Sequence, residues 1–184
     1  VVASEVSDGV QASLSISFAD LAGNAGAAAT LVTDGSSVTI DLTAPTLTAV
    51  AIRSDNAAIP VYTMAKAGDE VTLSFAADED ITGVTAKIAG SPAAVQATPS
   101  GGLREYSATY TVVLLSPNGL ATIQIDYEDM AGNAGVQQTV VIGPSAVTID
   151  TQAPTLTALT IASNNAASSS VAIAGNTITV ALSV

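Results

Sequence analysis

Most side chains in this sequence that could do chemistry are carboxylates, and some of them belong to a repeated motif. The motif reads DLAGNAG from Asp20 and DMAGNAG from Asp129, with Asn24 and Asn133 at its fifth position. Carboxylate and amide oxygens can bind a hard cation, but they also accept hydrogen bonds from the backbone of their own loop. The motif therefore has two interpretations, a set of cation ligands or a tight turn.

Further carboxylates stand at two other kinds of position. Asp41 and Asp150 end two copies of the sequence VTID, and Asp78, Glu79 and Asp80 form an acidic run. Acidic runs are usually solvated loop residues, so DED becomes a candidate ligand set only if the fold brings it to the other carboxylates. The sequence has no His and no Cys, the ligands that zinc prefers. Calcium accepts about six to eight oxygens in irregular geometry, whereas magnesium prefers a tight octahedron, so calcium is the better candidate.

Composition argues against catalysis and against several kinds of partner. Without His or Cys the usual nucleophile and base pairs cannot form, and the absence of Trp leaves few aromatic platforms for a sugar. Sixteen acidic residues face four basic ones, and the net charge of −12 repels nucleic acid phosphates. Polar residues interrupt every apolar stretch before the roughly 18 to 20 residues that a spanning helix needs. We expect no enzymatic activity, no nucleic acid partner and no membrane insertion.

Long internal repeats reveal the organisation of the chain. Residues 38–58, VTIDLTAPTLTAVAIRSDNAA, recur at 147–167 with an offset of 109, which is also the offset of the DxAGN motif. A later pair, KAGDEVTLSF at 66–75 and IAGNTITVAL at 173–182, has an offset of 107. A period of this length is close to the size of one β-sandwich domain and far longer than a solenoid repeat. The repeats therefore predict separate domains in tandem.

Two Pro-containing junctions define the expected domain boundaries. Pro45 and Pro154 restrict the residues before them to extended geometry, which predicts short and fairly stiff linkers. We expect residues 1–42 to be the later part of one domain, 43–150 a complete domain, and 151–184 the first part of a third. Since the chain begins at Val1 without a charged leader and an apolar run, we expect a mature product or an excised piece.

Period-two alternation rich in Val, Ile and Thr predicts an all-β domain of about seven strands. Turn signals separate the strands, including Gly68-Asp69 and the segments 99–102 and 116–119. The expected strands are residues 47–54, 70–77, 84–90, 106–114, 121–128 and 136–143. The aromatic residues Phe18, Phe75, Tyr110 and Tyr127 are expected to pack in the core or on strands. The side chains expected to point inward are Leu73, Phe75, Val112, Ile123, Ile125 and Val140, with Thr72, Ser74, Thr122 and Gln124 pointing outward.

The DxAGNxG turn followed by a strand and then the VTIDxTAPTLT junction resembles the bacterial Ig-like repeats of large extracellular adhesins and biofilm-associated surface proteins. The resemblance covers the whole chain, and it implies tandem immunoglobulin-like antiparallel sandwiches on the outside of a bacterial cell. Such repeats usually serve as stalks, while the binding modules lie elsewhere.

In an Ig-type sandwich the last two strands are joined at the end where the chain enters the domain. The resemblance therefore implies that Asp41, the DED run, Asp129 and Asn133 converge at the first junction and bind calcium that stiffens it. Asp20, Asn24 and Asp150 would belong to equivalent sites that are incomplete within this chain. The turn interpretation stays open beside the calcium site.

Two functions follow from this organisation. The first is a structural stalk in which each repeat contacts its neighbours. The alternative is a filament subunit whose partial domains complete each other between chains by strand donation. The alignment disfavours the alternative, because such a joint would omit the equivalent of residues 78–109, about 32 residues, and leave sheet edges unpaired.

Overall fold

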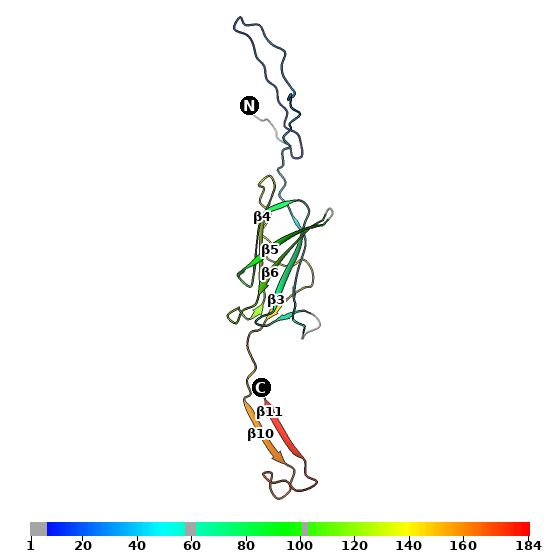
Figure 1. The fold of residues 1–184 in the computed structure, drawn as a ribbon, viewed down its shortest axis with the longest axis vertical. Coiled ribbons are helices and arrows are strands. Elements are labelled where there is room, and N and C mark those ends of the chain that lie inside the picture. The colour runs from blue at the N-terminus through cyan, green and yellow to red at the C-terminus, as the bar shows by residue number, and fades with distance from the viewer. Residues whose placement is uncertain (1–6, 58–61, 101–102) are drawn as a thin grey trace. The chain divides into compact units, whose positions relative to one another are not determined.

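The structure, a computed structural model, describes residues 7–57, 62–100 and 103–184 (Figure 1). Every regular element in these ranges is a β-strand, which confirms the all-β fold class. The chain divides into two compact units, Val1–Asp150 and Thr151–Val184. Of the turn expected at 99–102, residues 99 and 100 belong to a strand, and residues 101 and 102 lie outside the described ranges.

The described part of the first unit contains nine strands in two sheets. Six strands form one sheet in the order β1-β3-β6-β5-β4-β8, and three two-residue strands form another in the order β2-β9-β7. Neighbouring strands are antiparallel, except that β2 and β9 run parallel. The strands are β1 (Leu47–Ser54), β2 (Met64–Ala65), β3 (Glu70–Ala77), β4 (Ile81–Ile88), β5 (Ser91–Ser100), β6 (Leu103–Thr111), β7 (Gly119–Leu120), β8 (Ile123–Asp129) and β9 (Thr148–Ile149).

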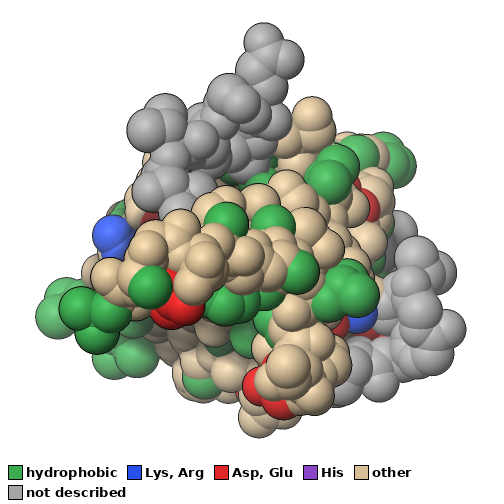
Figure 2. Space-filling model, turned by 90° about the horizontal axis from the view of Figure 1, so that it is seen from above, with side chains coloured by type: hydrophobic (Ala, Val, Ile, Leu, Met, Phe, Trp, Pro, Cys, Tyr) green, Lys and Arg blue, Asp and Glu red, His purple; other side chains and the backbone are tan. Residues whose placement is uncertain are grey.

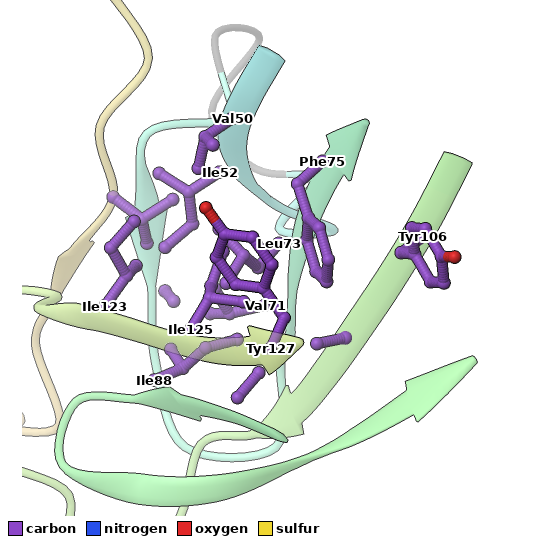
Figure 3. Close-up of a cluster of buried hydrophobic side chains, with 14 of the residues drawn as sticks. Val50, Ile52, Val71, Leu73, Phe75, Ile88, Tyr106, Ile123, Ile125 and Tyr127 are labelled. Carbon is purple, nitrogen blue, oxygen red and sulfur yellow. The ribbon is translucent and has the colours of Figure 1, made fainter. Parts of the chain in front are cut away.

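Strand β5 changes partners along its length and so divides the larger sheet into two layers. Its residues 91–93 pair with β4, whereas residues 94–100 pair with β6. β4 also pairs with β8, and β6 also pairs with β3. Apolar side chains from β1 and β3 therefore face those of β4 and β8 across a shared core (Figure 3). This is the sandwich-like arrangement expected from the sequence.

The core follows the predicted alternation along the two best-formed strands. In β3 buried and more exposed residues alternate from Val71 onward, and in β8 they alternate from Ile123 onward. Five of the six predicted inward positions are buried, whereas Ser74 and Thr122 are exposed and the other two outward positions are half-buried. Fully burying a side chain of the Val, Leu, Ile or Phe type contributes about 1.5–3 kcal/mol, so these positions dominate the stability of the sandwich.

The prediction of a strand at residues 136–143 is wrong, and so is the prediction that Val140 points inward. The segment forms only isolated bridges, Gln138 with Ile125 of β8 and Ile142 with Val50 of β1. Because it crosses from one layer to the other within four residues, it does not keep a constant face toward the core. Val140 lies in the crossing and is 65 % exposed.

The second unit contains the antiparallel pair β10 (Ala158–Ser163) and β11 (Ile178–Ser183). This pair has the same register as β1 and β3. Under the offsets of 109 and 107 residues, the end pairs of the regular part of the β1–β3 ladder, which excludes the shifted pair Leu47↔Ala77, convert to the end pairs of the β10–β11 ladder. Ala49↔Ala76 and Ser54↔Val71 become Ala158↔Ser183 and Ser163↔Ile178.

The loop between the two strands also has the same hydrogen bonds in both units. The Glu70 amide donates to Asp55 Oδ1 at 2.8 Å, and the Thr177 amide donates to Asn164 Oδ1 at 2.9 Å. In addition, the Asn176 side chain accepts from the backbone of Ile173, as the Asp69 side chain does from that of Lys66. Asn therefore replaces Asp at both loop positions without changing the geometry.

Residues 7–41 repeat the backbone pairing of residues 116–150 in a more open form. The bridges Ile16↔Ala29 and Ala19↔Ala25 correspond to Ile125↔Gln138 and Glu128↔Ala134. Several apolar side chains of this segment and of residues 151–184, among them Phe18 and Ile161, are exposed, whereas their counterparts Tyr127 and Ile52 belong to the core. Exposed apolar side chains are green where they face the viewer in Figure 2.

Candidate cation site

Three of the predicted ligand residues come together in the first unit. Asp41, Glu79 and Asp129 each place one carboxylate oxygen within 4.8 Å of the others. Asp129 is the last residue of β8, Glu79 lies in the short loop between β3 and β4, and Asp41 lies before the Pro45 linker. Asp129 is buried and the other two are half-buried. The fold thus gathers three negative charges from segments that are far apart in the sequence.

The carboxylate of Asp129 also closes the turn that follows it. Its Oδ1 accepts hydrogen bonds from the amides of Ala131 and Asn133, both at 2.8 Å, and its Oδ2 accepts one from Asn133 Nδ2 at 2.8 Å. Burial raises the pKa of Asp129, but the hydrogen bonds from Asn133 and Ala131 lower it by more, so its pKa lies below the usual value. Asp129 is therefore ionised at neutral pH although it is buried.

Asn133 connects the turn to the incoming chain. Its Nδ2 donates to the carbonyl oxygen of Asp41 at 3.2 Å as well as to Asp129. The sequence predicted its amide oxygen as a cation ligand, whereas the nitrogen is the atom directed at Asp41 and Asp129 here. In this arrangement Asn133 holds the two segments together by hydrogen bonds.

A ring stacked on a glycine explains the last position of the motif. A Cβ atom added to Gly135 would lie 2.2 Å from the ring of Tyr127, and one added to Gly26 would lie 2.2 Å from the ring of Phe18. Real Cβ atoms do not approach ring atoms so closely, so both copies need glycine at this position. The backbone amide of Gly135 also donates to the carbonyl of Tyr127 at 3.0 Å, which holds the turn against the ring.

Glu79 shows the electrostatic result of this convergence. Burial raises the pKa of Glu79, and the negative charges of Asp41, Asp129 and Asp78 raise it further, while Arg104 partly offsets them. Like charges at short range disfavour the ionised form of one another unless protons or a cation neutralise them. The three carboxylates therefore repel one another when all of them are ionised.

The other two residues of the DED run have partners outside this group. Asp78 accepts hydrogen bonds from the Thr46 amide at 2.8 Å and from Thr46 Oγ1 at 2.7 Å. These bonds lower the pKa of Asp78 below its usual value. Asp80 forms an ion pair with Arg104. The fold therefore uses Asp78 to fix the linker and pairs Asp80 with a basic residue.

The equivalent residues elsewhere show which part of the pattern is turn chemistry. Asp20 accepts hydrogen bonds from the Ala22 amide and from the amide and Nδ2 of Asn24, at 2.8–2.9 Å, as Asp129 does in its own turn. Asp20 is exposed and does not belong to a group of three such ligands within the described residues. At the other junction the Asp150 amide donates to the carbonyl of Ala65 at 2.8 Å. The motif therefore forms the same turn whether or not further carboxylates lie beside it.

Sequence reasoning missed the residues that fix the linker. Thr46 and Asp78 are joined by hydrogen bonds in both directions. Thr46 donates to the Asp78 carboxylate, and the Asp78 amide donates to the Thr46 carbonyl at 3.1 Å. Pro45 is fully buried. On the preceding side, Asp8 accepts hydrogen bonds from the Leu42 amide and from the Thr43 hydroxyl. The threonine after Pro45 was the one sequence feature that pointed to a fixed linker. Its partner, Asp78, lies 32 positions later and can be identified only from the fold.

The donor set at Asp41, Glu79 and Asp129 fits a hard divalent cation. All available donors are oxygens, which suits Ca2+ and excludes the nitrogen or sulfur ligands of a typical zinc site. Three carboxylates supply only part of the six to eight oxygens that Ca2+ accepts, so water or backbone carbonyls would complete the coordination. When bound there, the cation would neutralise the repulsion that raises the pKa of Glu79.

No family model matches this chain, and neither a curated protein nor a solved structure matches it. In the residues that the structure describes, no helix is long and apolar enough to span a membrane.

Proposed function

We infer that this chain is a structural segment of a tandem array of Ig-like sandwich domains in the stalk of an extracellular bacterial adhesin or biofilm-associated surface protein. In this proposal residues 1–42, 43–150 and 151–184 are parts of three successive repeats joined by Pro-containing linkers. The segment holds binding modules that lie elsewhere at a distance from the cell, and it has no catalytic role.

The observation that carries the proposal is the repetition of backbone geometry at the sequence offset. The β10–β11 ladder has the register of β1–β3, and the turn at Asp20 has the hydrogen bonds of the turn at Asp129. Equal sequence spacing with equal pairing is what tandem copies of one domain produce. A repeated domain without a catalytic dyad serves more naturally as a spacer than as an enzyme.

Calcium is the second part of the proposal. Asp41 belongs to the chain that enters residues 43–150, whereas Glu79 and Asp129 belong to that domain. A cation bound by all three would therefore connect the junction to the domain that follows it. The Thr46–Asp78 hydrogen bonds already restrain the linker, so calcium would stiffen a joint that is partly ordered without it.

Thermal melting and small-angle scattering of the full chain test this joint. With calcium at a hundredfold excess over Kd, the bound state gains about 2.7 kcal/mol, which corresponds to a rise in Tm on the order of 10 °C for a domain of this size. Magnesium should have a much smaller effect, and chelator should broaden the distribution of interatomic distances. The Glu79→Gln variant should lose most of the calcium effect, because it removes one charged ligand and leaves the turn intact.

The Glu128→Gln variant is the matched control. Glu128 precedes Asp129 on β8 and is exposed, so the substitution removes one nearby charge without touching the three ligands. It should keep the calcium response of the wild type. If calcium and chelator leave both Tm and the maximum dimension unchanged, the repeated motif is a turn and not part of a cation site.

The location is tested separately from the joint. Because the chain has no Cys, a Ser74→Cys variant of the parent protein carries a single thiol in this segment, on an exposed position of β3. A membrane-impermeant maleimide should label that thiol on intact bacteria if the segment lies on the outer surface. Labelling only after lysis would contradict the extracellular stalk.

A further inference from the structure

Asn118-Gly119 is the only Asn-Gly pair in the sequence, and both residues are exposed in the first unit. Gly119 begins β7 with a φ of 115°, in the left-handed region that favours glycine. A Cβ atom added to Gly119 would meet nothing within 4 Å, so the space beside this peptide bond is open. The glycine amide therefore carries no side chain that would hinder its approach to the Asn118 side chain.

The other six asparagines do not have this arrangement. Each of them precedes Ala, Asn or Thr, whose side chains crowd the following backbone amide. Attack of that amide on the asparagine side chain is correspondingly slower. These six positions serve as internal controls for any reaction at Asn118.

The first copy of the repeat shows which residues the position before this glycine accepts. Asp8-Gly9 lies there, and the Gly9 amide donates to the Ile40 carbonyl at 2.8 Å. Gly119 pairs with Ile149, the residue that follows Ile40 by the repeat offset of 109. An ordinary aspartate before the glycine is therefore compatible with the pairing of this segment.

We propose that Asn118 is a site of spontaneous deamidation and that the isoaspartate formed there loosens β9. The backbone nitrogen of Gly119 gives its proton to water or hydroxide and attacks Cγ of Asn118. The new N–Cγ bond closes a succinimide ring, the Cγ–Nδ2 bond breaks, and the side-chain nitrogen takes up a proton and leaves as ammonia. The reaction follows from the exposed Asn-Gly pair and does not depend on a role as an adhesin stalk or on calcium.

Water then opens the succinimide in one of two ways. If the new N–Cγ bond breaks, the product is an ordinary aspartate. If the bond between the same nitrogen and the backbone carbonyl carbon of residue 118 breaks, the product is isoaspartate, in which the chain continues through Cβ and Cγ. Both products exchange the amide group for a carboxylate, with ammonia released and water consumed.

The weakness of β7 makes the Gly119 amide accessible. β7 consists of Gly119–Leu120, both residues are exposed, and the strand lies at the edge of the sheet β2-β9-β7. A short exposed segment of this kind opens locally at a small cost in free energy. Local opening releases the Gly119 backbone from its pairing with Ile149 and lets its nitrogen approach Cγ of Asn118.

The two products differ in their effect on β9. Isoaspartate lengthens the backbone by one carbon atom directly before β7, so the pairs Gly119↔Ile149 and Leu120↔Thr148 lose their register. β9 then depends on its pairing with β2 alone. Ordinary aspartate leaves the backbone length unchanged, and Asp8 shows that it preserves the pairing.

Incubation of the full chain at mildly alkaline pH in heavy-oxygen water, followed by peptide mapping, tests the chemistry. The peptide that contains Asn118 should lose ammonia and gain one heavy oxygen before any other asparagine reacts, and an isoaspartyl methyltransferase should label part of the product. Asn118→Gln should remain unchanged. Three results would overturn the proposal: an unmodified Asn118, another asparagine that reacts faster, or a rate in the folded chain on the order of a hundredfold below that in urea, which would mean that the fold protects the site.

Hydrogen exchange of the separated forms tests the effect on β9. Amides of residues 147–149 should exchange faster by about tenfold or more in the isoaspartate form than in the fresh chain, because one side of β9 has lost its partner. Freshly prepared Asn118→Asp adds the same charge without lengthening the backbone and should stay within about twofold of the wild type. The loosening of β9 is refuted if the isoaspartate form exchanges like the fresh chain. Equally fast exchange in Asn118→Asp would refute the longer backbone as its cause.

Discussion

Asp129 serves two purposes with one carboxylate, and this explains why its motif can be interpreted in two ways. Its oxygens close a turn with Ala131 and Asn133, and one oxygen also lies in the group with Asp41 and Glu79. The sequence DxAGN forms this turn in both of its copies, as Asp20 shows. A cation site needs the turn to lie next to Asp41 and Glu79, as it does at Asp129. The motif alone therefore does not distinguish a turn from a cation site.

The glycine at the end of the motif provides a direct test of the turn. Gly135→Ala should destabilise residues 43–150 by about 1–3 kcal/mol, because the new methyl group overlaps the Tyr127 ring. Chemical denaturation monitored by circular dichroism measures the change. In a Tyr127→Leu background the same substitution should cost less, and the difference between the two costs gives the coupling between ring and glycine. Equal costs in both backgrounds would refute the ring contact as the reason for glycine.

The raised pKa of Glu79 predicts an unusual dependence of stability on pH in the absence of divalent cations. A carboxyl group whose pKa is raised by folding destabilises the folded state above that pKa, and the cost disappears as pH falls toward the usual value of 4.5. Asp78 and Asp129 have lowered pKa values, so the stability that they contribute is lost only below 3.8. Tm should therefore rise as pH falls from 7 toward 4.5 and decline below 3.8.

Substitution of Glu79 identifies the group responsible. Glu79→Gln should remove the rise in Tm between neutral pH and 4.5 and leave the decline below 3.8 in place. With calcium present the slope should reverse, because binding requires ionised Glu79 and weakens as pH falls through its raised pKa. Melting curves in chelator and in calcium, recorded across this range, measure both slopes. A Glu79→Gln variant with the wild-type profile would show that another group titrates.

The sequence identified the right residue types for the candidate site but not their partners. Asp41, Glu79 and Asp129 do come together, because the loop after β3 and the turn after β8 lie next to the incoming chain. Asp78 and Asp80 are directed to Thr46 and Arg104 instead. These pairings depend on tertiary distances between residues more than 20 positions apart, which no local pattern contains.

At the scale of elements, the sequence predicts strands well where buried and exposed residues alternate regularly, and poorly where the pairing is irregular. β1 and β3 have the bounds expected from the sequence, since each alternates between one buried and one exposed face. β5 was not expected, because Pro92, Pro99 and several Ala residues weaken its strand pattern. The segment 136–143 has the alternating pattern of a strand, but it passes from the β8 layer to the β1 layer. A two-residue hydrophobic period does not show where a segment changes layers.

Because residues 136–143 pass from one layer to the other, substitutions at Val140 and Ile125 should have very different effects on stability. Val140→Ser should change the free energy of unfolding by less than about 0.5 kcal/mol, because Val140 is mostly exposed. Ile125→Ala, one bridge away at the centre of β8, should cost about 2–5 kcal/mol because it leaves a cavity. Urea denaturation of both variants measures the two changes. A large loss for Val140→Ser would mean that residues 136–143 pack inward as a regular strand.

At the scale of the whole molecule, the two units should differ in protection from hydrogen exchange. Amides in β3 and β6 are paired on both sides of a buried sheet and should exchange only through global unfolding, whereas those of β10 and β11 should exchange quickly in dilute solution. Exchange followed by mass spectrometry tests this, and the peptides of β3 provide the internal control.

The position of β9 has a consequence for a chain that is stretched. β9 lies between β2 and β7. On the β2 side the amide of Thr148 donates to the Thr63 carbonyl at 2.7 Å, and the amide of Asp150 donates to the Ala65 carbonyl at 2.8 Å. The residue that carries tension out of this unit, Asp150, follows β9 directly. Tension along β9 would act parallel to the strand, so the bonds on both of its sides would be sheared together and could not open one after another. Rupture then requires several bonds to break at once, which makes this short strand a mechanical clamp for the sandwich.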